Sequence, residues 1–401
     1  MTARTATPRT ARAINDRIAL DLLTAQGPLT AAALRELTGL SRPSVADLLA
    51  RLGDDGLVTV VGEAGEERRG PKARLYGLVA DRAHVAAFDV RTTSVAFAVA
   101  DLAGRTVARR TLPVPPGGAD PGRHMVPAVL GALDDAVSAA GVPAVHTAVV
   151  GAPGLADPAS GALRPSHSLP GWHGDLVTAL RARLEGPLVL ENEVNLAGIA
   201  EHRVGAAAGR DTFVLLWLGH GIGAAVVLDG ALRRGASGGA GEIGFLPVPG
   251  TGGLPSADDC DSGFHALVGS AAVCDLARRH GLDVPDGDDA PAAEAAVRAA
   301  VDGTGPGEAA AFLDGLAGRV ALGVAGVASV LDPGCVVLGG EIGRAGGTAL
   351  AGLVARGLAR LSPLDTEVRP ATVTGSPVLG GGLLTALDAA RDDLFGPAIP
   401  H

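Results

Sequence analysis

The side chains best suited to recognition chemistry near the start of the chain are polar and basic, and they suit DNA. Arg42 carries a planar guanidinium that can bind guanine through two hydrogen bonds or pair with a phosphate, and the sequence leaves both roles open. A second cluster of basic residues follows at positions 68–74. We predict that DNA is contacted by Ser41, Arg42, Ser44, Arg68, Arg69, Lys72 and Arg74.

Three short helices and a hairpin are expected to position these residues. Apolar residues recur at helical spacing in "INDRIALDLLTAQG", and Gly27 ends that helix. Thr30 and Gly39 suit the two ends of a second helix, and Ser41 suits the N-cap of a third. The buried stripe of the third helix is predicted to be Val45, Leu48, Leu49 and Leu52.

Two β-rich runs in "LVTVVGEAGEERRGPKARLYGLV" predict a hairpin after the third helix. Helix-turn-helix followed by a hairpin predicts a winged helix-turn-helix domain over residues 1–80, with its third helix in the major groove. The distribution of charge along the chain supports a DNA-binding domain at this end. Residues 1–80 hold eleven basic and nine acidic residues, whereas the remainder holds 22 basic and 34 acidic residues. Nucleic acid should therefore meet the first 80 residues and be repelled by the rest.

The sequence also predicts a compartment. The amino terminus lacks the apolar segment of a signal peptide, and the longest apolar stretch, near residues 320–331, is too short to cross a bilayer. The three cysteines have no paired spacing, which fits a reducing environment. We expect a soluble cytoplasmic protein without a membrane partner.

The remaining residues predict an α/β protein. Strand-like and helix-like runs alternate twice, with glycine turns at strand ends, which indicates two lobes over residues 81–200 and 201–401. The final helix is free to pack back on the first lobe. Residues 281–310 are rich in Asp, Gly and Pro and are expected to form a polar, mobile insertion.

The order of the motifs resembles the ROK family, which contains repressors, open reading frames and sugar kinases. The motifs are "LPGW" (169–172), "ENEVNLAGIAE" (191–201), "GHGIG" (219–223), "GEIG" (241–244) and "VVLGG" (336–340). This resemblance implies a two-lobed, actin-like ATPase fold. The family's kinases phosphorylate hexoses with ATP, whereas its regulators add a winged helix and sense a sugar.

Three departures from the kinase pattern argue against catalysis. In "DVRTT" (89–93), Arg91 and Thr92 stand where the family's first phosphate loop has two glycines, which permit close approach of backbone to phosphate. His220 replaces the usual Thr of the second phosphate turn. Glu193 replaces the catalytic Asp, and a misplacement of about 1 Å can cost about a hundredfold in rate. We predict no enzymatic activity, with Glu193 as a degenerate base position.

The resemblance still implies a ligand site. Carried over by motif, Asn192, Glu193 and Glu242 are retained, while His265 and Ser168 lie where the same cleft would be lined. The simpler alternative is that Asn192 only caps a helix and that Glu242 is a solvated turn residue. Phe245 would make the site less polar than a hexose site.

The family's zinc loop is not preserved. Phe245 replaces its histidine, and Cys260 is the single cysteine left in the loop, so four tetrahedral ligands cannot be assembled from this segment. We predict no metal and no cofactor.

The sequence thus predicts a transcriptional regulator, a repressor, that binds a double-stranded DNA operator and senses a sugar-like effector without phosphorylating it. Two alternatives stay open: an active ATP-dependent sugar kinase with a DNA-binding domain, and a ligand-independent regulator. We expect a homodimer or homotetramer because operator half-sites and the family resemblance favour one.

Overall fold

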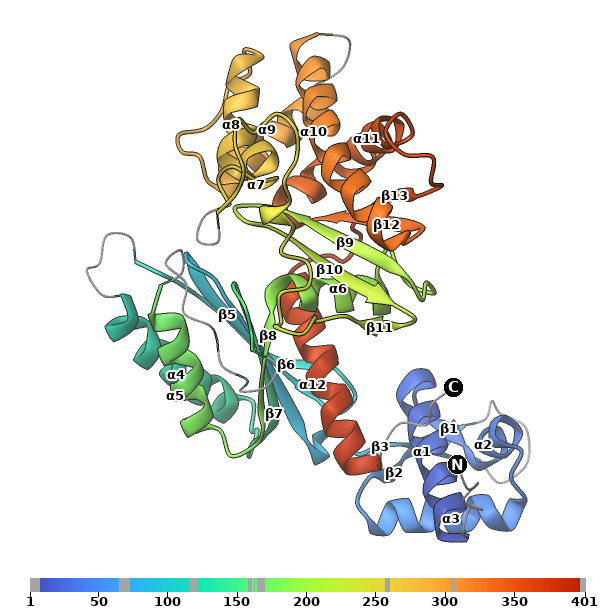
Figure 1. Cartoon of the computed structure of the whole chain (residues 1–401). Coiled ribbons are helices and arrows are strands. Elements are labelled where there is room, and N and C mark those ends of the chain that lie inside the picture. Colours follow the sequence, from blue (N-terminus) through green and yellow to red (C-terminus); the bar gives the residue numbers. More distant parts are fainter. Residues whose placement is uncertain are drawn as a thin grey trace.

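We describe a computed structural model of the chain. It covers residues 8–64, 73–115, 121–157, 161, 163, 170–256, 260–303 and 307–396. Three bodies follow one another along the chain: a small N-terminal domain and two sheets with their helices (Figure 1). The predicted α/β class and winged helix are confirmed. Arg68, Arg69, Lys72 and Ser168 lie outside the described residues.

The N-terminal domain is a winged helix. Its elements are α1 (Pro8–Gln26), β1 (Leu29–Thr30), α2 (Ala31–Thr38), α3 (Arg42–Asp54), β2 (Val58–Ala64) and β3 (Ala73–Leu78), with strand order β1-β3-β2. The Thr30 side chain caps α2 by accepting from the Ala33 amide, and Gly39 ends it at a positive φ of 69°. The predicted stripe of α3 is buried as expected: Val45, Leu48, Leu49 and Leu52.

The first lobe is built on a five-stranded sheet of order β6-β5-β4-β7-β8. It follows the short 3₁₀ turn η1 (Ala80–Arg82). Its strands are β4 (His84–Val90), β5 (Ser94–Asp101), β6 (Thr106–Pro113), β7 (Val145–Ala152) and β8 (Leu188–Asn192). Helices α4 (Pro121–Ala139) and α5 (Trp172–Arg183) cover one face and share a core with it.

The second lobe is built on a sheet of order β11-β10-β9-β12-β13. Its strands are β9 (Phe213–Leu218), β10 (Ile222–Leu228), β11 (Ala231–Leu232), β12 (Cys335–Gly339) and β13 (Glu367–Pro370). The helical elements of this lobe are η2 (Ile243–Phe245), α7 (His265–Val268), α8 (Ser270–Arg279), α9 (Ala290–Asp302), α10 (Glu308–Leu331) and α11 (Gly340–Leu358).

Two helices lie between the sheets. α6 (Glu193–Val204) and α12 (Pro377–Phe395) share one core with residues of both sheets. α12, red in Figure 1, runs from this position to the blue winged helix. The final helix therefore packs on the first-lobe sheet, against β4 and β7, and on α6.

Two expectations about the second lobe are corrected. Residues 290–302 are not a polar insertion, because α9 buries Ala293, Ala296 and Val297 in the core of this lobe. The apolar run near residues 320–331 belongs to the longer helix α10, which is long and apolar enough to cross a membrane. In this fold α10 buries Phe312, Leu316 and other side chains in the core of the second lobe.

Candidate functional site

The exposed face of α3 is the first candidate surface. Arg42 and Ser44 are exposed near its first turn, directly after the exposed N-cap residue Ser41. The Ser41 side chain accepts from the Ser44 amide at 3.3 Å, so part of its hydrogen-bonding capacity stabilises the helix end. No described carboxylate forms an ion pair with Arg42. In contrast, Arg51 of the same helix is paired with Asp47 and Asp16. Arg42 is thus the arginine of α3 that can reach a ligand without breaking an ion pair.

The wing presents one described basic residue. Arg74 lies on β3 with its side chain exposed, and β3 pairs with β2 in the predicted antiparallel hairpin. Since residues 65–72 fall outside the described chain, the roles of Arg68, Arg69 and Lys72 stay a prediction.

Arg91 forms ion pairs with carboxylates of both lobes, and we use the word cleft for the group of charged residues around it: Asp89, Arg91, Glu193, Glu242 and Glu341. Its Nε donates to Asp89, at the end of β4, over 3.1 Å, and its Nη1 donates to Glu341, in the first turn of α11, over 2.7 Å. Burial alone would lower the pKa of Arg91, but the charges of Asp89 and Glu341 outweigh burial and raise it. Arg91 therefore stays charged and links the first lobe to the second.

The second phosphate turn of the sequence analysis lies under this ion pair. A Cβ on Gly219 would lie 2.4 Å from the Glu341 carboxylate and 3.0 Å from the indole nitrogen of Trp217. The Arg91 guanidinium in turn lies 5.9 Å from the centre of the Trp217 ring. The Glu341 carboxylate thus packs directly against the glycine turn. Sequence reasoning missed Glu341, although it directly follows the "VVLGG" strand.

Asn192 is largely occupied by structural hydrogen bonds. Its side-chain oxygen caps α6 by accepting from the Val194 amide at 2.8 Å, and its side-chain nitrogen donates to the Gly154 carbonyl at 3.0 Å. Glu191, also missed by sequence reasoning, is buried and accepts from the Asn192 amide, from Asn195 and from Arg234. The helix cap therefore accounts for the bonds of the Asn192 oxygen, whereas its nitrogen ties β8 to the segment after β7, and a ligand contact of Asn192 stays a prediction.

The carboxyl group of Glu193 has a strongly raised pKa. Desolvation raises its pKa to about 8; Arg91 opposes this, whereas Asp89, Glu341 and Glu242 add to it. None of the described hydrogen bonds involves the Glu193 carboxyl group. At neutral pH this group is therefore mostly protonated and can donate a hydrogen bond to a ligand oxygen.

Replacing Glu193 with Gln should remove a pH dependence of stability. Because the folded-state pKa lies above the ordinary value of 4.5, the contribution of this group to stability is complete below pH 4.5 and is lost as the pH rises through about 8. The wild type should lose about 2 kcal/mol of unfolding free energy, relative to Glu193→Gln, between about pH 5 and about pH 9. This value is reduced for the partial contact of Glu193 with solvent. Denaturant titrations at both pH values measure this, with the exposed Glu185→Gln as control. An equal difference at both pH values would contradict the assignment.

Glu242 and His265 lie on the second-lobe side of the cleft. Glu242 is exposed immediately before η2, and desolvation raises the pKa of its carboxyl group. Its negative charge adds to the raised pKa of Glu193. His265 begins α7, and its Cβ lies 3.8 Å from the position that a Cβ on Gly244 would take.

The loop after Glu242 contains one group of potential metal ligands. The donor atoms of Cys260, Asp261 and His265 all lie within 4.8 Å of one another. Sequence reasoning did not anticipate this group, because it looked for the four ligands of the family's zinc loop. Three donors fall short of the closed four-ligand set of a structural zinc site. Phe245 is partly exposed near this loop and supplies no donor atom.

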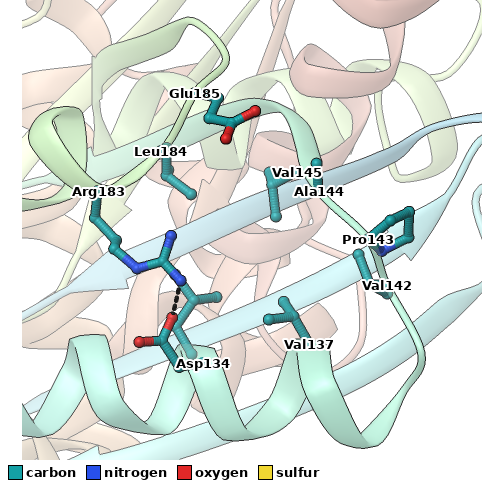
Figure 2. A pocket seen from close by; sticks show the side chains of 10 residues that line it. Asp134, Val137, Val142, Pro143, Ala144, Val145, Arg183, Leu184 and Glu185 are labelled. Carbon is teal, nitrogen blue, oxygen red and sulfur yellow. Dashed lines mark hydrogen bonds and ion pairs between the residues drawn. The ribbon is translucent and has the colours of Figure 1, made fainter.

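Figure 2 shows a separate pocket in the first lobe, lined by residues of α4, of β7 and of the segments next to β7 and α5. Val137, Val142 and Val145 line it together with Arg183 and Asp134, which form an ion pair. Val145 begins β7, whereas the residue that pairs with Asn192, Ala152, ends it. The pocket therefore lies away from the cleft and contains none of the predicted site residues.

Comparison with known proteins identifies the families that this chain resembles. The ROK family model matches residues 85–381, and a MarR family model matches residues 15–69. The bifunctional enzyme NanE/NanK of Brucella melitensis is 36% identical over 166 residues, which are 41% of this chain and 29% of the enzyme. The DNA-binding transcriptional dual regulator NagC of Escherichia coli is 23% identical over 65% of this chain and 63% of its own.

Among solved structures, a ROK family transcriptional regulator that is a homologue of the E. coli MLC protein has the same fold. Its TM-score is 0.72 at 19% identity, and the match covers 96% of this chain and 98% of the other. The chain spans less than a third of the length of the NanE/NanK enzyme that it matches. Since the family model covers most of the sequence, from β4 into α12, the chain belongs to the ROK family.

Proposed function

We propose that this protein is a DNA-binding transcriptional repressor whose ROK domain binds a sugar or sugar-derived molecule without phosphorylating it. The observation that carries the second half of this proposal is the Arg91–Glu341 ion pair, which lies over the Gly219 turn.

The winged helix supports DNA binding. The MarR family match runs from within α1 through α2, α3 and β2. Arg42 is exposed beside the capped start of α3, where a helix-turn-helix protein contacts base edges. The similarity to NagC and to a ROK family transcriptional regulator favours the same role. A double-stranded operator is the partner that we propose, read by a homodimer or homotetramer in the cytoplasm.

The cleft is poorly suited to nucleotide phosphates. A phosphoryl group that approached the Gly219 turn would meet the carboxylate of Glu341, and it would have to compete for an arginine that already has two partners. Kinases instead stabilise the charge of the transferred phosphoryl group with backbone amides, cations and metal ions. The positive charge of Arg91 is thus already paired with the carboxylates of Asp89 and Glu341 and is not available to a phosphate.

The remaining polar groups suit a hydroxylated ligand. Protonated Glu193 can donate a hydrogen bond, exposed Glu242 can accept one, and the imidazole of His265 can do either. Hydroxyl groups both donate and accept, so a sugar satisfies this mixture. No cofactor is needed for such binding.

The alternative of an active kinase is favoured by the similarity to NanE/NanK, and a turnover assay decides between the two. We expect no nucleotide consumption when purified protein is incubated with ATP, Mg²⁺ and a panel of hexoses and amino sugars in a coupled assay. Addition of a commercial hexokinase should then start the reaction and validate the reagents. Clear turnover that Glu193→Gln abolishes would contradict the proposal.

A further inference from the structure

We propose that α12 is a rigid strut that couples the ion pairs of the cleft to the orientation of the winged helix, with Arg17 as the residue that fastens the winged helix to it. The role of this coupling in regulation rests on the proposed function, whereas the contacts of α12 described below do not depend on it.

The cleft end of α12 is attached to the residues that carry the site. Ser376 caps the helix by accepting from the Leu379 amide, and its hydroxyl donates to Asp89 over 3.3 Å. Asp89 is also a partner of Arg91. A change in the ion pairs of Arg91 therefore acts directly on the first residue before α12.

Glycines bring the body of α12 into backbone contact with the same elements. A Cβ on Gly381 would lie 1.8 Å from the carbonyl oxygen of Leu196 in α6, and one on Gly382 would lie 2.8 Å from Ala87 in β4. α6 begins with Glu193, and β4 contains Asp89. α12 therefore packs at backbone distance on α6 and directly on the Ala87 methyl group of β4, the two elements that supply the first-lobe site residues.

The other end of α12 holds the winged helix through Arg17. This α1 side chain is buried, and its Nη1 donates to Asp392 over 2.7 Å and to the Gly396 carbonyl. Its guanidinium also lies 6.0 Å from the centre of the Phe395 ring. Phe395 belongs to the same core as Leu20 and Leu23 of α1. The last turn of α12 is thus part of the hydrophobic core of the winged helix.

Asp16, next to Arg17 in α1, connects α1 to α3, the predicted recognition helix. Asp16 accepts from Arg51, in the last turn of α3, over 2.6 Å. Adjacent residues of α1 therefore bind α12 on one side and α3 on the other.

The length and the packing of α12 allow it to act as the rigid strut. Nineteen residues of α-helix span about 28 Å, and a helix packed at backbone distance along its first half cannot bend locally without losing those contacts. If Arg91 loses Glu341, it is free to bind Asp89 more fully and to compete with Ser376 for that carboxylate. The contact that fixes the start of α12 is then weakened, and the disturbance reaches Arg17 through the helix.

A double-mutant cycle measured by hydrogen exchange tests the strut in the full chain, without DNA or ligand. Glu341→Gln removes the cleft ion pair, and Asp392→Ala removes the link to Arg17. Asp393→Ala is the matched control, because this neighbouring residue pairs with His146 on the first lobe. Amides of α1 report the result, and amides of α10 report any general loss of stability. Asp392→Asn replaces Asp392→Ala if the alanine variant does not fold.

We expect Asp392→Ala to accelerate exchange in α1 about tenfold, with Asp393→Ala leaving it near the wild-type rate. Glu341→Gln should accelerate exchange in α1 about threefold in the wild-type background and add nothing in the Asp392→Ala background. Effects of distant residues without shared partners are otherwise additive. An equal effect of Glu341→Gln in both backgrounds, or no effect on α1 in either, would overturn the proposal. Neither outcome bears on whether the protein binds DNA or a sugar.

Discussion

Gly381→Ala is expected to destabilise the protein by about 2 kcal/mol. The added methyl group would lie 1.8 Å from the Leu196 carbonyl oxygen, a backbone atom that cannot move without displacing α6. Overpacking of this kind costs about 1–3 kcal/mol or more, and the better helix propensity of alanine offsets only about 1 kcal/mol. Urea-induced unfolding followed by circular dichroism measures the change.

The adjacent residue provides the control. A Cβ on Gly380 would meet only the Ala200 methyl group, at an ordinary contact distance of 3.9 Å. Gly380→Ala should therefore leave stability unchanged or raise it by up to about 1 kcal/mol. Similar effects of both substitutions would show that α12 is not held against α6 at backbone distance.

The winged helix was predictable from the sequence because its signals are local. Thr30, Gly39 and Ser41 bound their helices through contacts with residues at most four positions away. The apolar stripe of α3 follows from helical periodicity alone. Each of these features depends on the chain within one or two turns.

The cleft was predictable only in part because its contacts are distant in sequence. Arg91 stood out as a substitution for glycine, but its partner Glu341 follows 250 residues later, and no spacing rule joins them. Asn192 illustrates the opposite problem, since one residue type suits both a helix cap and a ligand contact. The sequence left both roles open; the side-chain oxygen of Asn192 caps α6, its side-chain nitrogen donates to the distant Gly154 carbonyl, and the ligand role stays a prediction.

The α9 segment was mispredicted because composition was weighed above periodicity. The run "DVPDGDDAP" before and at its start is polar, and Asp289 is in fact the N-cap of the helix. The alanines that follow bury one face, a pattern that a search for helical spacing would have found.

Arg42→Ala is expected to weaken binding to an operator by about 1–3 kcal/mol if the residue contacts a base. Arg42→Lys provides the control, because lysine keeps the charge but cannot form the paired hydrogen bonds of a guanidinium with guanine. A base contact therefore predicts that both variants lose affinity and specificity. A phosphate contact predicts that lysine restores most of the affinity and that alanine reduces the salt dependence.

Binding of selected DNA by the Arg42 variants shows whether this chain contacts DNA through α3. Genomic fragments selected with the wild-type protein serve as the probe, and the affinities of wild type, Arg42→Ala and Arg42→Lys are compared in a shift titration at fixed salt concentration. Wild-type protein should enrich discrete fragments, and the affinity for them should fall about fivefold or more in Arg42→Ala. Failure to enrich any fragment, or equal affinity of wild type and Arg42→Ala, would contradict DNA contact through α3.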